Sequence, residues 1–268
     1  MAEIAIRILG GVGDEVKIEV KDGFYRNKKN TEGISVYGTL PLLIKKFFKI
    51  NKNGYNSIKD YNENLNYDLT IGLVGDSFIE GYHVDVSKSI GRLIENKCDE
   101  ITVIEYGIGG YNIHNYIEIY ESRNMKNFKK VYFFIHITDF LVDKPYRSKY
   151  NKLKETYFRP LYNASKLVKF INKNHKPFAA KKELNRHISQ FTKEKTIAFL
   201  QKAKNVSFIY RNDVISEELD FLLDKIEIIN HKRIPFNYGF DHHWNDNGRL
   251  NIADQILIDL EIKTCQNF

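Results

Sequence analysis

The stretch Ile71–Tyr82 reads IGLVGDSFIEGY, and it decides how the surrounding chain is interpreted. A short apolar run leads into Gly75-Asp76-Ser77, and a second glycine follows at Gly81. The run predicts a buried strand, and the glycine permits a tight turn directly after it. The serine at this turn is either a helix cap or a nucleophile presented at the end of a strand.

Strand-like and helix-like segments alternate on the carboxyl side of this stretch. Apolar runs predict strands at 68–75, 101–107, 130–138, 206–212 and 226–230, and amphipathic patterns predict helices at 87–97, 113–125, 191–204, 215–225 and 245–262. The last helix is expected to bury Leu250, Ala253, Ile256, Leu257 and Leu260. Such alternation predicts an α/β fold, a flavodoxin-like three-layer sandwich with a central parallel sheet. Chemistry in such folds gathers at the carboxyl ends of the strands.

Two parts of the sequence, residues 1–66 and 144–190, do not follow the strand–helix alternation, and their hydrophobic periodicity is weaker. Residues 1–66 are expected to form an N-terminal extension that packs on or leads into a domain at 67–268. Within the extension, 16–20 alternates like a short strand, and 39–50 suits either a short amphipathic helix or a pair of strands. Residues 144–190 are rich in Lys, Arg and Tyr and predict a basic helical insertion.

Composition bounds the class of protein. The chain has 268 residues, of which 43% are hydrophobic and 28% charged, which is globular composition. The formal net charge is +7, but the lysines are spread along the chain without a recognition motif, so a nucleic-acid partner is not expected. An anionic glycan or membrane surface also suits this charge. The two cysteines, Cys98 and Cys265, are in no metal-like spacing and are expected to be free thiols.

The candidate nucleophile Ser77 needs a base, and the base needs an orienting acceptor. The string FDHHWNDNG supplies Asp241 and His243 two residues apart, with His242 as a competing base. The string YGIGGYN follows a predicted strand, and its Gly110 N–H is a candidate donor to an oxyanion, although an ordinary glycine-rich turn is the alternative. Its glycines do not fit a dinucleotide-binding fingerprint. Thr138 ends another predicted strand and would lie at the same edge as Ser77.

Four of these strings together resemble the SGNH/GDSL hydrolase superfamily. They are GDSFIEG, GIGGYN, HITDF and DHHWNDNG, in the order and spacing of the four blocks of that superfamily. The resemblance covers about residues 68–260, and its last block resembles the Asp-x-His-Trp-Asn variant of proteins that act on O-acetylated polysaccharides. It implies a triad of Ser77, His243 and Asp241, an oxyanion hole of the Ser77 and Gly110 amides with Thr138, and no metal or organic cofactor.

The resemblance implies a serine esterase that removes or transfers a small acyl group, most plausibly O-acetyl, on a carbohydrate or cell-surface glycan. The third block departs from the family because Thr138 replaces the usual asparagine, a donor to the oxyanion. A threonine hydroxyl is shorter and must point inward to replace it. The alternative is therefore a catalytically weak glycan-binding or assembly protein on the same scaffold. The acyl group, the acceptor and the oligomeric state are left open.

The first 66 residues also resemble a bacterial subgroup of this superfamily. In that subgroup a membrane anchor precedes a pattern like EIAIRILGG, and a segment like NKNGYNSIKDY comes just before the serine block. The resemblance implies an anchor upstream of residue 1 and a domain outside the cytoplasm. If Met1 is the native start, the expectation is instead a soluble cytoplasmic protein.

Overall fold

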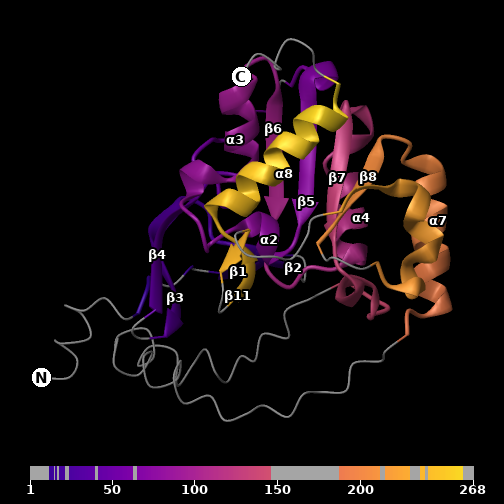
Figure 1. The fold of residues 1–268 in the computed structure, drawn as a ribbon, viewed down its shortest axis with the longest axis horizontal. Coiled ribbons are helices and arrows are strands. Elements are labelled where there is room, and N and C mark those ends of the chain that lie inside the picture. Colours follow the sequence, from indigo (N-terminus) through magenta and orange to yellow (C-terminus); the bar gives the residue numbers. More distant parts are fainter. Residues whose placement is uncertain are drawn as a thin grey trace, which may run out of the picture.

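The central element is a five-stranded parallel sheet. The computed structural model describes residues 12–14, 16, 18–21, 24–39, 42–62, 65–145, 187–211, 215–229, 236–238 and 241–261. The sheet has the order β6 (Thr102–Gly107), β5 (Thr70–Gly75), β7 (Lys130–Ile135), β8 (Val206–Tyr210) and β9 (Ile226–Ile229), and every neighbouring pair is parallel. This is the flavodoxin-like order, in which the second strand lies outside the first and the others follow on the opposite side. The predicted fold class, α/β with a central parallel sheet between helices, is confirmed (Figure 1).

The strands and helices of this sheet lie close to the ranges that the sequence predicts. The α-helices are α2 (Ser77–Glu80), α3 (Ile90–Lys97), α4 (Ile113–Ser122), α7 (Gln190–Lys202) and α8 (Asp246–Asp259). Short 3-10 helices are η1 (Tyr67–Leu69), η2 (Val86–Lys88), η3 (Met125–Asn127), η4 (Ile137–Phe140) and η6 (Glu217–Lys225). The sequence predicted an α-helix at the place of η6.

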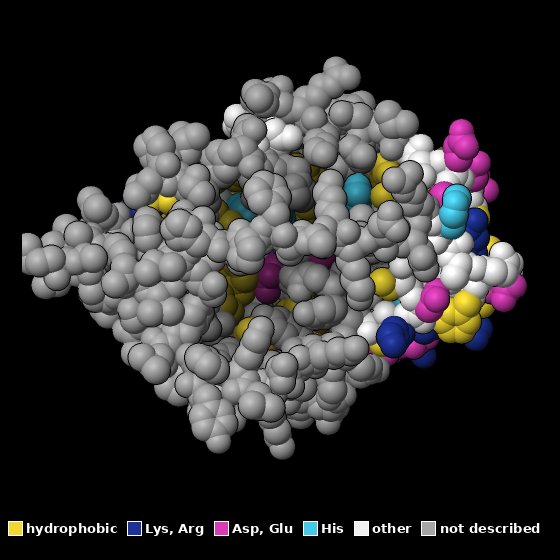
Figure 2. Space-filling model, turned by 90° about the horizontal axis from the view of Figure 1, so that it is seen from below, with side chains coloured by type: hydrophobic (Ala, Val, Ile, Leu, Met, Phe, Trp, Pro, Cys, Tyr) yellow, Lys and Arg dark blue, Asp and Glu magenta, His cyan; other side chains and the backbone are white. Residues whose placement is uncertain are grey.

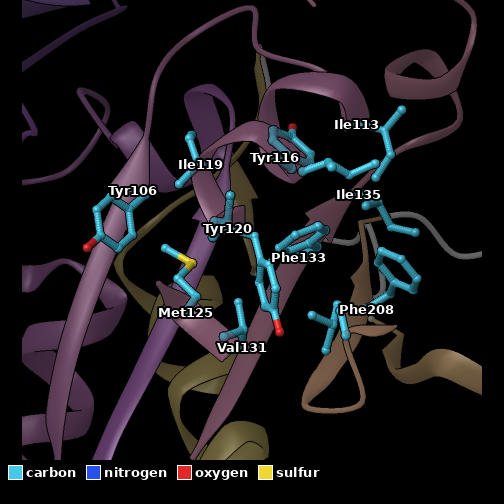
Figure 3. Packing of buried hydrophobic residues seen from close by; sticks show 14 of the residues in the cluster. Tyr106, Ile113, Tyr116, Ile119, Tyr120, Met125, Val131, Phe133, Ile135 and Phe208 are labelled. Atoms are coloured by element: carbon cyan, nitrogen blue, oxygen red, sulfur yellow. The ribbon is translucent and has the colours of Figure 1, made fainter. Parts of the chain in front are cut away.

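Two hydrophobic clusters cover the two faces of the sheet. The larger one joins α4, α7 and η6 to β6, β7 and β8, and Figure 3 shows its centre around Phe133, with Tyr116, Tyr120 and Phe208. The second joins α3 and α8 to the other face and includes Trp244. Because both faces are covered, β5, β6, β7 and β8 are buried almost from end to end and are mostly apolar, as in other parallel sheets.

The closing helix α8 buries a different stripe from the one that the sequence predicted. Ala253, Ile256, Leu257 and Leu260 are buried as expected, but Leu250 is 39% exposed and Ile252 is buried in its place. The helix also buries Arg249, which donates to the carbonyl oxygen of Phe78 at 2.7 Å. This carbonyl belongs to the segment that directly follows β5. The face of α8 that contains Arg249 therefore lies against this segment, and Leu250 points away from it.

The prediction of free thiols is wrong for Cys98, which is disulfide-bonded. Cys98 ends α3, is buried, and belongs to the cluster that holds the end of α8 at Leu260. Figure 1 shows α3 and α8 side by side, and the two helices are packed against each other. The sequence holds one other cysteine, Cys265, which lies outside the described residues.

The N-terminal extension forms antiparallel hairpins. They are β1 (Ile18–Lys21) with β2 (Phe24–Asn27), and β3 (Thr31–Thr39) with β4 (Leu42–Ile50). A third small pair, β10 (Asn237–Tyr238) with β11 (Asp241–Trp244), precedes α8. The helix alternative for 39–50 is therefore wrong, because Leu42–Ile50 forms a strand that pairs residue by residue with β3. No helix in the described ranges is long and apolar enough to cross a bilayer.

The β3–β4 hairpin packs against the segment that follows α2. Phe48, Ile50 and Tyr82 form a small cluster of their own. The Ser35 hydroxyl donates to the carbonyl oxygen of Tyr82 at 2.5 Å. The extension therefore contacts the chain just after the turn that carries Ser77. Of the predicted insertion at 144–190, residues 146–186 lie outside the described residues.

Candidate active site

The turn between β5 and α2 carries Ser77 at the carboxyl edge of the sheet. The β5 strand lies between β6 and β7, where the chain reverses the direction in which strands are added. Ligands bind at such switch points in open α/β sheets. Figure 2 looks at this edge from below, and histidine and acidic side chains are visible among hydrophobic ones near the middle.

Local interactions fix the geometry of this turn. The Asp76 carboxylate caps α2 by accepting from the Phe78 amide at 3.1 Å. Gly81 ends the helix with φ of +70°, and a Cβ there would lie 2.5 Å from the Arg249 guanidinium. A glycine is therefore required at this position for its backbone conformation and for its space. Ser77 is the first residue of α2, so its amide has no acceptor within the helix.

The structure brings Ser77 and His243 together from opposite ends of the domain. The distance between Ser77 Oγ and His243 Nε2 is 2.9 Å, and both residues are half-buried. His243 lies in β11, and the turn after β11 is fixed because Asn245 caps α8 by accepting from the Gly248 amide. A serine hydroxyl within hydrogen-bond reach of an imidazole is the arrangement of a nucleophile and its base.

The His243 ring lies between two other rings. It stacks on His83 with centroids 3.8 Å apart and planes 14° apart, and it contacts Phe78 at 4.5 Å on a 30° tilt. His83 is buried, and its ring in turn contacts Tyr37 of β3 at 3.8 Å. Trp244 packs edge-on against Phe78 at 4.9 Å. These contacts hold the plane of the His243 ring.

The other two residues of the predicted histidine block are only partly described. Asp241 begins β11 and His242 follows it, but the side chains of both lie outside the described residues. In the described ranges, no three His, Cys, Asp or Glu residues are grouped in a way that could hold a metal ion.

The loop that carries Gly110 lies directly beside Ser77. A Cβ added to Gly109 would lie 3.8 Å from the Ser77 Cβ. Gly110 itself is exposed and has φ of +85°, in the left-handed region that favours glycine. The Gly109 amide donates to Glu80 at 2.9 Å. The structure thus brings this loop to the predicted serine, and it ties the loop to α2.

Thr138 lies on η4, just after β7. Its side chain is exposed, and its Oγ1 lies 2.9 Å from Nδ1 of His136. In the described part of the chain, the side-chain hydrogen bonding of Thr138 is with His136 and not with Ser77 or Gly110. Thr138 is therefore at the expected edge of the sheet, with its hydroxyl engaged locally.

A buried ion-pair network supports the turn from beneath. Arg211, just after β8, lies 3.0 Å from Asp76 and 3.5 Å from Asp139, and its guanidinium stacks over the Phe78 ring at 4.0 Å. Burial raises the pKa of Asp139, and Arg211 opposes that shift. Asp139 also accepts from the His136 amide at 2.9 Å. The network joins the ends of β5, β7 and β8, which is the edge where Ser77 lies.

Sequence reasoning missed four residues of this neighbourhood. Arg211 could have been found as a lone charge at the end of an apolar strand, and Glu80 as an acid within the serine block. His83 and Tyr37 carried no such signal, because they come from a loop and from the weakly periodic extension.

The comparisons with known proteins give structural similarity at low identity. No family model and no curated protein matches the chain. A member of the lipolytic protein G-D-S-L family from Veillonella parvula DSM 2008 has 12% identity and a TM-score of 0.41, over 73% of this chain and 98% of that chain. A putative lipolytic protein of the G-D-S-L family from Desulfitobacterium hafniense DCB-2 has 14% identity and a TM-score of 0.35, over 70% and 97%.

A third solved structure is that of a carbohydrate esterase whose active site is described as having divergent catalytic and non-catalytic binding functions. It has 12% identity and a TM-score of 0.37, over 94% of this chain and 96% of that chain. The chain is thus structurally similar to G-D-S-L lipolytic proteins and to a carbohydrate esterase. The roles of individual residues rest on the geometry of the site.

Proposed function

We propose that this protein is a serine esterase of SGNH/GDSL type that removes or transfers a small acyl group, O-acetyl, on a carbohydrate or cell-surface glycan. The observation that carries the proposal is the 2.9 Å contact between Ser77 Oγ and His243 Nε2 at the carboxyl edge of the sheet. A hydroxyl in contact with an imidazole at a switch point is suited to nucleophilic attack on a carbonyl carbon.

In the proposed mechanism, Ser77 Oγ attacks the acyl carbonyl carbon while His243 Nε2 takes the hydroxyl proton. The tetrahedral intermediate collapses, the bond between the acyl carbon and the sugar oxygen breaks, and His243 gives the proton to that oxygen. Water, or a second sugar hydroxyl, then attacks the acyl-enzyme with His243 again as base. The bond between Ser77 Oγ and the acyl carbon breaks, His243 returns the proton to Ser77 Oγ, and the carboxylic acid or the acylated acceptor is released. Asp241 is proposed as the acceptor for His243 Nδ1, from its spacing of two residues in β11.

The developing oxyanion needs donors aimed at it before the reaction begins. The proposed donors are the amides of Ser77, at the start of α2, and of Gly110, in the loop beside it. Thr138 is the third candidate, and its contact with His136 makes its share the smallest. An ester of a cell-envelope glycan is in keeping with the disulfide at Cys98, because disulfides persist in oxidising compartments.

The test is hydrolysis of p-nitrophenyl acetate by the wild-type protein beside Ser77→Ala, with both shown to be folded by circular dichroism. We expect Ser77→Ala to lower kcat by about a thousandfold or more, because the nucleophile is lost. Asp241→Asn should lower kcat without lowering the free energy of unfolding, and a loss of folding would assign Asp241 to structure. Equal rates in wild type and Ser77→Ala would overturn the esterase proposal and favour a glycan-binding protein.

A further inference from the structure

We propose that Glu80 is a positioning residue, which fixes the Gly109-Gly110 loop beside Ser77 and connects that loop to the N-terminal extension. This inference rests on the proposed function, since it concerns the same site. Glu80 is the last residue of α2, three positions after Ser77, and only 7% of it is exposed. Burying a carboxylate is costly unless donors surround it, so its contacts indicate what holds it there.

The two carboxylate oxygens of Glu80 accept from different parts of the chain. Oε2 accepts from the Gly109 amide at 2.9 Å, and Oε1 accepts from Asn27 Nδ2 at 2.8 Å. The backbone carbonyl of Glu80 accepts from Asn56 Nδ2 at 2.7 Å. Asn27 ends β2 and Asn56 follows β4, so both donors belong to the extension. One side chain thus joins the nucleophile's helix, the Gly109-Gly110 loop and the first hairpin.

The Gly109-Gly110 loop is in close backbone contact with α2. A Cβ at Gly107 would lie 2.1 Å from the Glu80 backbone nitrogen, and a Cβ at Gly109 would lie 2.8 Å from Glu80 Oε2. Side chains are therefore excluded from this contact, and the loop approaches the helix through its backbone. The separation of the loop from Ser77 is set by the hydrogen bond from Gly109 to the carboxylate.

Glycines need such an anchor if they are to present an amide in one direction. Gly109 and Gly110 are adjacent, and glycine has the widest backbone freedom of any residue. The Gly110 amide belongs to the peptide that joins these two residues, so its direction follows the conformation of Gly109. The hydrogen bond from the Gly109 amide to Glu80 Oε2 restricts that conformation. The donor is then preorganised, which is the property that stabilises an oxyanion.

The experiment compares Glu80→Ala, Glu80→Gln and Asn27→Ala with the wild type and with a matched control, Glu105→Gln. Glu105 is also a buried carboxylate, but its donors are the Ser89 hydroxyl and the Gly91 amide at the start of α3, and not the amide of Gly109. Two quantities are measured for each folded protein. One is the hydrogen-exchange rate of the peptide 107–111, and the other is the rate of p-nitrophenyl acetate hydrolysis, which is resolved into kcat and KM.

We expect Glu80→Ala to speed exchange in 107–111 about tenfold or more, and to lower kcat about ten to a hundred times with KM nearly unchanged. Glu80→Gln keeps one acceptor oxygen, so its effects should be smaller, and it serves as the test if Glu80→Ala does not fold. Asn27→Ala keeps the Gly109 contact and should have the smallest effect of the three. Glu105→Gln should leave exchange in 107–111 and kcat unchanged.

Unchanged exchange in 107–111 or unchanged kcat in folded Glu80 variants would overturn the proposal, as would an equal loss of kcat in Glu105→Gln. The exchange measurement does not depend on activity. If the wild type shows no hydrolysis that depends on Ser77, the esterase proposal fails. Exchange that is faster in the Glu80 variants alone would then still support the role of Glu80 in holding the loop, and unchanged exchange would overturn it.

Discussion

Two regions hold the turn at Ser77, and they do so by different means. On the side of the sheet, Arg211 joins the carboxylates that follow β5 and β7 in a buried ion-pair network. On the other side, the N-terminal extension reaches the turn through Asn27 and Tyr37, by a hydrogen bond to Glu80 and a ring contact with His83. The sheet fixes the position of the strand end, and the extension fixes the groups around the serine.

Because the two regions act by different means, we expect one to determine the stability of the fold and the other to determine the turnover rate. Removing a partner from the buried network should mainly lower the free energy of unfolding, because it leaves buried charges unpaired. Weakening the contacts of the extension should mainly lower kcat, because these contacts orient the ring of His83 and the Gly109-Gly110 loop. They are not ion pairs, so their loss leaves no buried charge without its counter-charge. Four predictions test this comparison, from the largest effect to the smallest.

The largest effect is expected from Arg211→Met on the side of the sheet. Asp76 and Asp139 would then be left without their buried cation, so the free energy of unfolding should fall by about 3–5 kcal/mol. Urea denaturation followed by circular dichroism measures it. The control is Lys88→Met, which removes an exposed pair with Asp246 and should change stability little. A loss in Arg211→Met no greater than in the control would break the comparison.

The second prediction uses the pH dependence of stability at Glu80. Burial raises the pKa of Glu80 from 4.5 to about 7, and Asn27 and the Gly109 amide oppose the shift while Asp76 adds to it. A carboxyl with a raised pKa in the folded state favours folding at pH below 4.5, and this stability is lost as pH rises through about 7. The stability of the wild type relative to Glu80→Gln should therefore fall by up to about 3 kcal/mol across this interval.

Urea denaturation of both proteins at several values between pH 4.5 and 8 measures this difference, and titrations common to the two proteins cancel in it. A constant difference across the range would show that Glu80 titrates normally. The extension would then not contact a carboxyl group whose pKa is raised by burial.

The third prediction concerns the ring of His83, which stacks on the proposed base, His243. His83→Ala removes the face on which His243 stacks, so kcat should fall roughly tenfold, with little change in KM. His83→Phe keeps an aromatic face and should retain most of the activity. Steady-state kinetics on p-nitrophenyl acetate measures both variants. Equal loss in the two would mean that His83 acts through its nitrogen atoms and not through stacking.

The smallest effect is expected at Thr138. Its hydroxyl is engaged with His136, so Thr138→Val should lower kcat by less than about threefold, far below the cost of a full oxyanion donor. Thr138→Asn supplies a longer donor and should preserve or raise kcat. The same kinetic assay decides it. A loss of a hundredfold in Thr138→Val would instead make Thr138 a principal donor.

The sequence by itself determined the α/β class, the parallel sheet and the position of Ser77 at the end of β5. It did so because apolar runs and amphipathic periods are local signals, and because parallel strands end at one edge. It also indicated His243 as a partner, although only the fold brings residues 77 and 243 to 2.9 Å.

The tertiary structure alone decided which side chains support that pair. The supporting contacts join segments that are far apart in the chain, and they are made by Arg211, Glu80, His83 and Asn27. The hydrophobic pattern within one segment does not predict such contacts. The same holds for Leu250, which the helical period predicted to be in the core. Leu250 is exposed because the buried Arg249 donates to the carbonyl oxygen of Phe78, and this contact sets the rotation of α8. Periodicity specifies that a face is buried, and the packing partners decide which residues form that face.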